Sequence, residues 1–305
     1  MSDPAPTRFR LDVAYDGTDF RGWSRQPGLR TVQGVLEEAL ATVLRRVEPL
    51  PSLVVAGRTD AGVHAARQVA HVDLDAEHLA ALRSQRGSGR LSVPERLASR
   101  LRGILASTTD VVVRSVREAP PGFDARFSAA WRRYEYRIAD RFEARDPLQR
   151  SRTLWHPAVL DEDAMQESAL AMLGLHDFAA YCKPRPEATT IRTLQDFRWT
   201  RDRDGLLTAE VRADAFCHSM VRSLVGASVA VGEGRLPPER PAELLATDTR
   251  SSEFLVLPAK GLTLMEVAYP PDGDLAARAV ETRARRAAAE PEAAGPAVVD
   301  APQLG

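Results

Sequence analysis

Arg58 and Asp60 are the residues of this chain whose types and spacing most favour chemistry. They stand two positions apart in the segment AGRTDAGVHA, residues 56–65, directly after an apolar run. Gly57 and Gly62 permit tight turns there, which would hold both side chains at the end of a strand, facing a cleft. An aspartate is ionised at neutral pH, so Asp60 would act as an acceptor or nucleophile rather than as a general acid. Taken alone, the segment favours a salt bridge between the two residues.

Metal and cofactor chemistry is not indicated by the sequence. The segment lacks the glycine spacing and the lysine of a phosphate-binding Walker sequence. His64 and His71 lack carboxylates with a known facing geometry, so they are predicted to be structural, and no metal or cofactor site is predicted. Cys182 and Cys217 fit a reducing compartment, exclude a disulfide framework and are predicted to be buried thiols.

Two tyrosines stand among arginines in the segment WRRYEYRI, residues 131–138. Tyr134 and Tyr136 share one face of a predicted strand, and such a face usually packs into a core. Aromatic rings flanked by arginines are also what a base-stacking surface needs. Both interpretations stay open for Tyr134, whereas a core position is favoured for Tyr136. Arg222, in the segment FCHSMVRSLVG, is predicted to be tethered on a buried helix.

The composition is that of a globular chain of one or two domains. Its 305 residues are 44% hydrophobic and 27% charged, with a formal net charge of -1, so a polyanion partner would need a local basic patch. No apolar run reaches the roughly 20 residues of a membrane span, and the first ten residues lack the apolar core of a secretory signal. A cytoplasmic protein without a membrane partner is therefore expected.

Hydrophobic periodicity predicts the same order of elements twice. Apolar residues alternate in the predicted strands and recur at helical spacing in the predicted helices. The first half contains strands at 8–15, 53–56, 68–74 and 111–116, with helices at 32–47 and 94–105. The second half contains strands at 132–139, 193–200, 206–213 and 262–267, with helices at 161–173 and 220–231. This order predicts an α+β fold of two tandem ferredoxin-like (RRM-like) β-α-β-β-α-β halves.

Domain boundaries follow from this repeat. Residues 1–118 are expected to form an N-terminal ferredoxin-like domain that carries the Asp60 loop, and residues 119–271 a second ferredoxin-like domain. Residues 84–94 form a polar, glycine-containing loop. Residues 272–305 are rich in alanine, proline and charge, which predicts a disordered or loosely helical tail.

Five segments together resemble the tRNA pseudouridine synthase A family, from about residue 8 to residue 270. In chain order they are AYDGTDFRGWSRQP, TVQGVLEEAL, AGRTDAGVHA, FDARFSAAWRRYEYRI and AFCHSMVRSLVG. The resemblance implies an isomerase that converts uridine to pseudouridine at positions 38, 39 and 40, in the anticodon arm of tRNA. It also implies the pseudouridine synthase fold, in which the sheets of two ferredoxin-like halves join around a central basic cleft, and a homodimer that contacts tRNA with both subunits.

The resemblance also assigns roles to four residues. Asp60 would be the catalytic nucleophile, and Arg58 would pair with it and help to displace the base. Tyr134 would lie against the target uracil, and Arg222 would steady the aspartate. The isomerisation changes no oxidation state and consumes no water, so it requires no cofactor.

Sequence leaves the route of the reaction open. The carboxylate could attack C1′ or C6 of the uridine, or remove a ribose proton to give a glycal. In each case the base must first be extruded from the stem or loop, at a cost of a few kcal/mol. Two other classes compete with this interpretation: an RNA-binding protein in which the Arg58 and Asp60 pair is structural, and a metal-dependent RNA hydrolase, for which clustered acidic ligands are not found.

Overall fold

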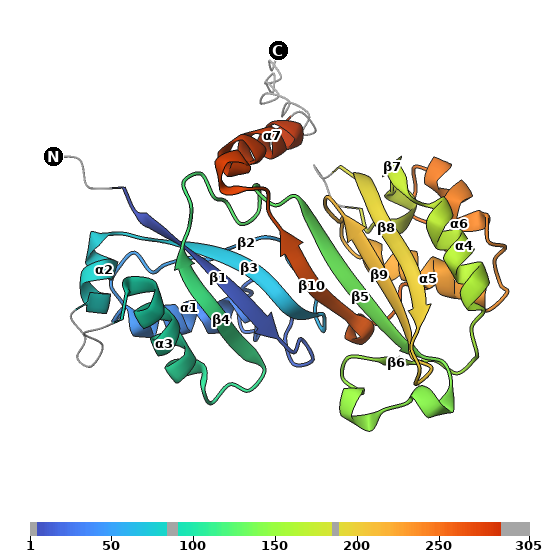
Figure 1. The fold of residues 1–305 in the computed structure, drawn as a ribbon, viewed down its shortest axis with the longest axis horizontal. Helices are drawn as coiled ribbons and strands as arrows, with labels where there is room; N and C mark the ends of the chain where they lie inside the picture. The colour runs from blue at the N-terminus through green and yellow to red at the C-terminus, as the bar shows by residue number, and fades with distance from the viewer. Residues whose placement is uncertain (1–4, 84–90, 185–188, 288–305) are drawn as a thin grey trace, which may run out of the picture.

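One mixed sheet of ten strands runs through the molecule (Figure 1). The computed structural model describes residues 5–83, 91–184 and 189–287. Most of the loop predicted over 84–94, and the end of the predicted tail, lie outside the described residues. The α+β class predicted from the sequence is confirmed by the sheet and its helices.

The first half is built around its first strand. β1 pairs antiparallel with both β3 and β4, and the short β2 pairs with β3. The strands are β1 (Thr7–Tyr15), β2 (Val54–Val55), β3 (His64–Leu74) and β4 (Val111–Glu118), and the helices are α1 (Val32–Val43), α2 (Ala76–Arg83) and α3 (Val93–Leu105). Along β1 the buried residues alternate, as the sequence predicts for a strand with one face in the core.

The second half is likewise built around its first strand, since β5 lies between β9 and β10. The strands are β5 (Trp131–Ala139), β6 (Leu154–Trp155), β7 (Gly174–Asp177), β8 (Ile191–Arg201), β9 (Leu207–Ala213) and β10 (Leu262–Ala268). The helices are α4 (Glu162–Ala171), α5 (Met220–Gly232), α6 (Arg240–Glu243) and α7 (Leu275–Ala287). Short 3-10 turns occupy Phe142–Ala144, Pro147–Gln149, Ala179–Tyr181, Leu244–Ala246, Ala259–Gly261 and Asp272–Asp274.

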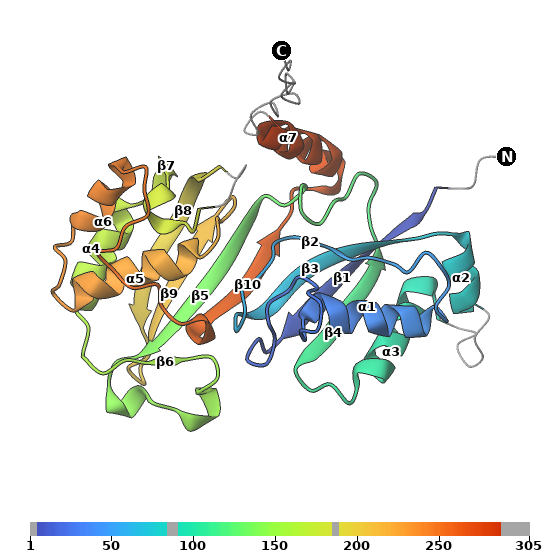
Figure 2. The ribbon, with the colours of Figure 1, turned by 180° about the vertical axis from the view of Figure 1, so that it is seen from behind.

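β10 joins the two halves into one sheet. It pairs antiparallel with β5 and parallel with β3, where Thr263 lies opposite His64 and Leu264 opposite Ala65. The strand order is therefore β4-β1-β3-β10-β5-β9-β8-β7, and the division into two ferredoxin-like halves stays a prediction. Figures 1 and 2 show α1 to α3 at one end of the molecule and α4 to α6 at the other, with β10 and β5 between them. The domain boundary at residue 118 stays a prediction.

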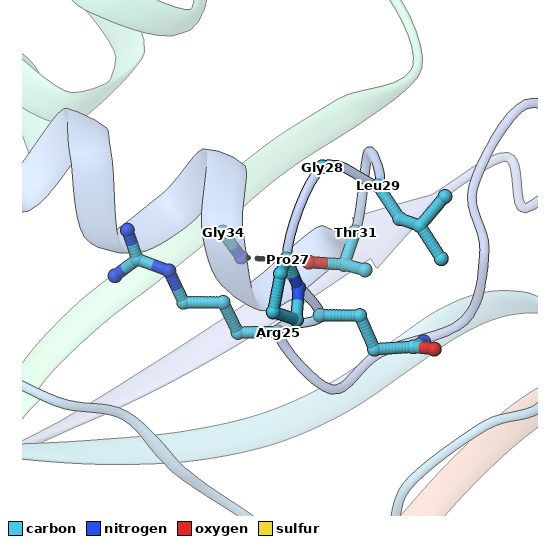
Figure 3. A pocket seen from close by; sticks show the side chains of 7 residues that line it. Arg25, Pro27, Gly28, Leu29, Thr31 and Gly34 are labelled. Atoms are coloured by element: carbon cyan, nitrogen blue, oxygen red, sulfur yellow. Dashed lines mark hydrogen bonds between the residues drawn. The ribbon is translucent and has the colours of Figure 1, made fainter.

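Helix α1 shows how local sequence sets these elements. Thr31 is its N-cap, and the Thr31 hydroxyl accepts a hydrogen bond from the Gly34 amide at 3.2 Å (Figure 3). Val32, Leu36 and Leu40, four residues apart, are fully buried on one helical face. The helix ends earlier than predicted, because Arg45 and Arg46 have the positive φ angles of a left-handed turn.

Several elements were not predicted. The missing elements are α2, α6, β6 and β7, all of them short or with little apolar periodicity. The tail predicted from residue 272 to be disordered or loosely helical begins with a helix, α7. Leu275 and Ala279 are buried in the structure, so tertiary packing supplies the order that composition alone does not indicate.

Gly17 allows the chain after β1 to touch the loop that carries Asp60. A Cβ atom at Gly17 would lie 2.1 Å from the Val63 carbonyl oxygen, and the Gly17 amide donates a hydrogen bond to His64 Nδ1 at 3.0 Å. The Val63 amide in turn donates to the Asp60 carbonyl at 3.2 Å. A side chain at position 17 would therefore displace the backbone that ends the Asp60 loop.

We expect Gly17→Ala to lower the free energy of unfolding by about 1–3 kcal/mol, because the added methyl group meets backbone atoms that cannot move independently. The matched control is Gly103→Ala, which lies on an exposed part of α3 with open space around it. That change should be neutral or should stabilise by up to about 1 kcal/mol. Urea unfolding of the two variants measures the difference, and equal stability of both would contradict the packing described.

Candidate active site

The loop between β2 and β3 is held by hydrogen bonds at successive positions. Gln68 Nε2 donates to the Gly57 carbonyl at 2.9 Å, and the Tyr15 and Thr59 hydroxyls are 2.8 Å apart. The Trp23 amide donates to the Thr59 carbonyl at 3.1 Å. These bonds fix the backbone on the N-terminal side of Asp60, so the position of its carboxylate is set by buried residues rather than by the loop alone.

Asp60 contacts two basic residues of the other half of the chain. Arg222 Nη1 lies 3.6 Å from Asp60 Oδ2, and His218 Nε2 lies 3.4 Å from Oδ1. The Asp60 side chain is 29% exposed and that of Arg222 is 21% exposed, so the carboxylate is partly shielded but still reachable. His218 was not predicted from the sequence as a site residue. Nothing in the motif FCHSMVRSLVG indicates that this histidine contacts a loop 158 residues earlier.

Arg222 is itself tied in place. It stands in the first turn of α5, and its Nε donates to the Leu257 carbonyl at 2.6 Å. The prediction of a tethered arginine on a buried helix is confirmed, since all but one of the helix residues are buried. The tether leaves the Nη1 group directed at Asp60.

Arg58 lies in the same loop but forms no ion pair with Asp60 among the described residues. Its side chain is exposed and lines the cleft that contains Asp60. The local sequence predicted a salt bridge between Arg58 and Asp60, and the resemblance predicted the same pairing. Both predictions are wrong for this structure. The reason is that Arg222 and His218, which approach from another element, occupy the carboxylate oxygens.

Tyr134 packs at the edge of the core and also lines the cleft. Its ring meets the Phe216 ring edge to face, with centroids 5.1 Å apart, and the residue is 8% exposed. Burial, followed by the nearby Tyr15 hydroxyl, raises the pKa of Tyr134. Tyr136 is fully buried, and its hydroxyl donates to the Pro258 carbonyl at 2.8 Å, so its predicted core position is confirmed.

Arg132 joins three segments beneath the cleft. Its guanidinium donates to the carbonyl oxygens of Asp214 at 2.7 Å, Ala56 at 2.8 Å and Arg126 at 3.0 Å. Burial lowers the pKa of Arg132. Ala56 begins the Asp60 loop and Asp214 follows β9, so this one side chain links the two halves next to the site.

The cleft around Asp60 is strongly basic. Its volume is about 1040 Å³, enough for a nucleotide with adjoining backbone. Six arginines and two aspartates line it, namely Arg58, Arg126, Arg132, Arg192, Arg222 and Arg278 with Asp60 and Asp214. The whole chain has a net charge of -1, but positive charge is concentrated in this cleft. The cleft is therefore the kind of local basic patch that a polyanion partner would need.

Cys182 and Cys217 are joined by a disulfide, with Cα atoms 5.8 Å apart. The prediction of two separate thiols is therefore wrong. The two segments run together because the Lys183 amide donates to the His218 carbonyl at 2.9 Å, a contact that the sequence does not reveal. The link lies next to His218, on the side of the site formed by the second half.

Metal and membrane features were also sought in the described part of the chain. Residues 5–83, 91–184 and 189–287 contain no group of three or more His, Cys, Asp or Glu side chains that could hold a metal ion. Within the same ranges, none of the helices has both the length and the apolar character needed to cross a bilayer.

Part of the chain matches a known protein family. A family model described as tRNA pseudouridine synthase matches residues 169–270, which include β8, β9, α5 and β10. With a mixed sheet and an aspartate in a basic cleft, the match places the chain in the class of pseudouridine synthases.

Similarity to individual proteins extends over nearly the whole chain. tRNA pseudouridine synthase A of Leifsonia xyli is 61% identical over 287 residues, which cover 94% of this chain and 99% of the relative. The proteins of the same name from Streptomyces griseus and Mycobacterium leprae are 54% and 49% identical, and cover 93% and 90% of this chain and 95% and 94% of the relatives. The chain belongs to the tRNA pseudouridine synthase A family, which is a family of isomerases.

Stability should fall at alkaline pH because burial raises the pKa of each of the five tyrosines, that of Tyr15 to about 12. A tyrosine in the unfolded chain loses its proton near pH 10, whereas the folded chain retains it. The unfolded state therefore binds fewer protons above pH 10, and the stabilisation that is complete below this pH is lost as the pH rises towards 12.

The contribution of Tyr134 can be isolated with Tyr134→Phe. Above pH 10 the variant should lose stability less steeply than the wild type, by about 1.4 kcal/mol per pH unit. Urea unfolding at pH 9, 10 and 11 measures the two slopes. Parallel curves for the two proteins would contradict a buried, neutral Tyr134.

Proposed function

We propose that the protein converts uridine to pseudouridine at positions 38, 39 and 40 in the anticodon arm of tRNA, with Asp60 as the nucleophile. The observation that carries the proposal is the Asp60 carboxylate, contacted by Arg222 and His218 within a cleft lined by six arginines. The proposal includes action in the cytoplasm, which rests on the sequence composition, and as a homodimer, which rests on the family resemblance alone.

The chemistry needs only groups that the cleft contains. The bond from C1′ to N1 breaks, the uracil turns, and a bond from C1′ to C5 forms, while C5 loses a proton and N1 gains one. Atoms and electrons balance without an oxidant or a water molecule. Asp60 would attack C1′ or C6, or take a proton from the ribose, and each route uses the same carboxylate.

Arg222 and His218 would act by positioning. Both contact the oxygens of Asp60, so they hold the carboxylate in one orientation. The carboxylate then loses less conformational freedom when it reacts. Arg222 is tied to the Leu257 carbonyl, which makes its own position rigid. The charge on the Asp60 carboxylate changes during the reaction, and the contacts with Arg222 and His218 would also compensate for this change.

Tyr134 and Arg58 would handle the extruded base. The Tyr134 ring lines the cleft and is fixed against Phe216, so it offers a preformed face for uracil stacking. Arg58 is exposed at the cleft and forms no ion pair within the described ranges, which leaves its guanidinium available for the vacated stack or for a phosphate. Together they would offset the cost of base extrusion, which is about a few kcal/mol.

We expect Asp60→Asn to abolish pseudouridine formation in an anticodon-arm tRNA transcript while tRNA binding is retained, because the amide keeps the shape of the carboxylate but not its nucleophilicity. The wild-type protein should turn over without added metal or nucleotide. Asp204→Asn, in the exposed turn between β8 and β9, is the control and should behave as the wild type. Product is measured by nuclease digestion and mass spectrometry after chemical labelling of pseudouridine.

Two results would overturn this assignment in different ways. Normal turnover by Asp60→Asn would remove Asp60 from the chemistry. Binding of tRNA by the wild type, without product on any tRNA, would favour an RNA-binding protein instead.

Arg222→Lys tests the positioning role. Lysine keeps the positive charge but loses the planar fork that contacts Leu257 and Asp60 at once, so we expect the single-turnover rate to fall roughly 10- to 100-fold. Binding of tRNA and the melting temperature should change little. Arg198→Lys, an exposed arginine on β8, is the matched control. An unchanged rate in Arg222→Lys would mean that charge alone suffices.

A further inference from the structure

Helix α7 contributes to the cleft although it lies beyond the segment that the family model matches. Both views place it over the middle of the molecule, close to β10 and the beginning of β5 (Figures 1 and 2). Arg278 and Thr282, one turn apart on this helix, line the same cleft as Asp60. The proposed chemistry gives neither residue a role.

The helix is firmly docked. The Ser128 hydroxyl donates to the Leu275 carbonyl at 3.0 Å, and Arg283 forms an ion pair with Asp124 at 2.7 Å. Gly122, with a φ of +76°, lets the backbone of its loop approach Ala276, since a Cβ there would lie 2.5 Å from the Ala276 Cβ. These contacts fix α7 on the loop that leads into β5, so its cleft-facing side chains have a defined position.

Arg278 lies on the cleft-facing side of α7, in a cleft lined by five other arginines. Its side chain is 24% exposed, and its Nη1 pairs with Glu281 on the same helix at 3.0 Å. Its Nε is buried and has no hydrogen-bond partner within the described ranges. The charge of Arg278 acts on the buried Arg132 and contributes, after burial, to lowering the pKa of Arg132. Arg278 and Arg132 both line the cleft and both add positive charge to it, which favours an anion there.

We propose that the Arg278 guanidinium forms a subsite for the sugar-phosphate backbone of the substrate RNA, at the α7 side of the cleft. This inference rests on the proposed function for the identity of the RNA. The Thr282 hydroxyl donates to the Arg278 carbonyl at 2.8 Å, so the donor for a phosphodiester oxygen is the partly exposed Arg278 guanidinium. Such contacts fix the register of RNA without reading its sequence. Arg126 lines the cleft between α7 and β5 and extends the same basic wall.

The test is Arg278→Gln, assayed for tRNA affinity at several salt concentrations and for the single-turnover rate at saturating tRNA. We expect affinity at low salt to fall about tenfold, as for one charge-assisted hydrogen bond. The slope of log affinity against log salt should become shallower by about 0.7–0.9, as for one phosphate contact. The single-turnover rate should not change, because the subsite positions RNA away from the reacting atoms. Arg278→Lys should restore most of the slope.

The matched control is Arg240→Gln. Arg240 also pairs with a glutamate three residues later, Glu243 at 2.9 Å, but it lies on α6 and does not line the cleft. It should leave the affinity and the slope at wild-type values. Thermal unfolding shows whether each variant is folded, and Arg278→Lys provides a second measurement if glutamine disturbs α7.

The outcomes separate the subsite from the reaction. Wild-type product together with unchanged affinity and slope in Arg278→Gln would overturn the subsite and leave the proposed function intact. An Arg278-dependent slope without wild-type product would support the subsite and overturn the proposed reaction. A loss of single-turnover rate at saturating tRNA would overturn the subsite as described, because Arg278 would then act on the chemistry.

Discussion

The contact between Asp60 and Arg222 is the interaction on which the rest of the site depends. The two residues belong to different halves of the chain, and their charged groups approach to 3.6 Å only because the halves share one sheet. The tethered guanidinium of Arg222 orients the Asp60 carboxylate, which is partly shielded without being fully buried. The fold thus brings a nucleophile from one half to a positioning group from the other.

Three features maintain this contact. β10, the last strand, inserts between β3 and β5, so the end of the chain closes the sheet next to the Asp60 loop. Arg132 binds carbonyl groups on both sides of the junction. Gln68, Tyr15 and Trp23 fix the loop from within the first half. Because these hydrogen bonds are largely buried, the site is preformed and requires little ordering when RNA binds.

Sequence periodicity predicted the long strands and helices because each has one apolar face, as in β1 and α1. The resemblance to a family, rather than periodicity, predicted that Asp60, Arg58, Tyr134 and Arg222 share one site, and all four line one cleft. The partners of Asp60 could not be predicted, since the contact with His218 depends on how two distant segments pack. The same holds for the Cys182 and Cys217 pair and for the docking of α7 on the loop before β5.

A crystal structure of the Asp60→Asn variant with an anticodon-arm tRNA tests the central claim most directly. The account predicts one uridine turned out of the RNA, with its uracil on the Tyr134 ring and its C1′ or C6 within about 3.5 Å of the residue 60 side chain, as in a near-attack arrangement. A uridine that stays stacked in the RNA, or an extruded base bound away from residue 60 with Arg222 facing solvent, would contradict it.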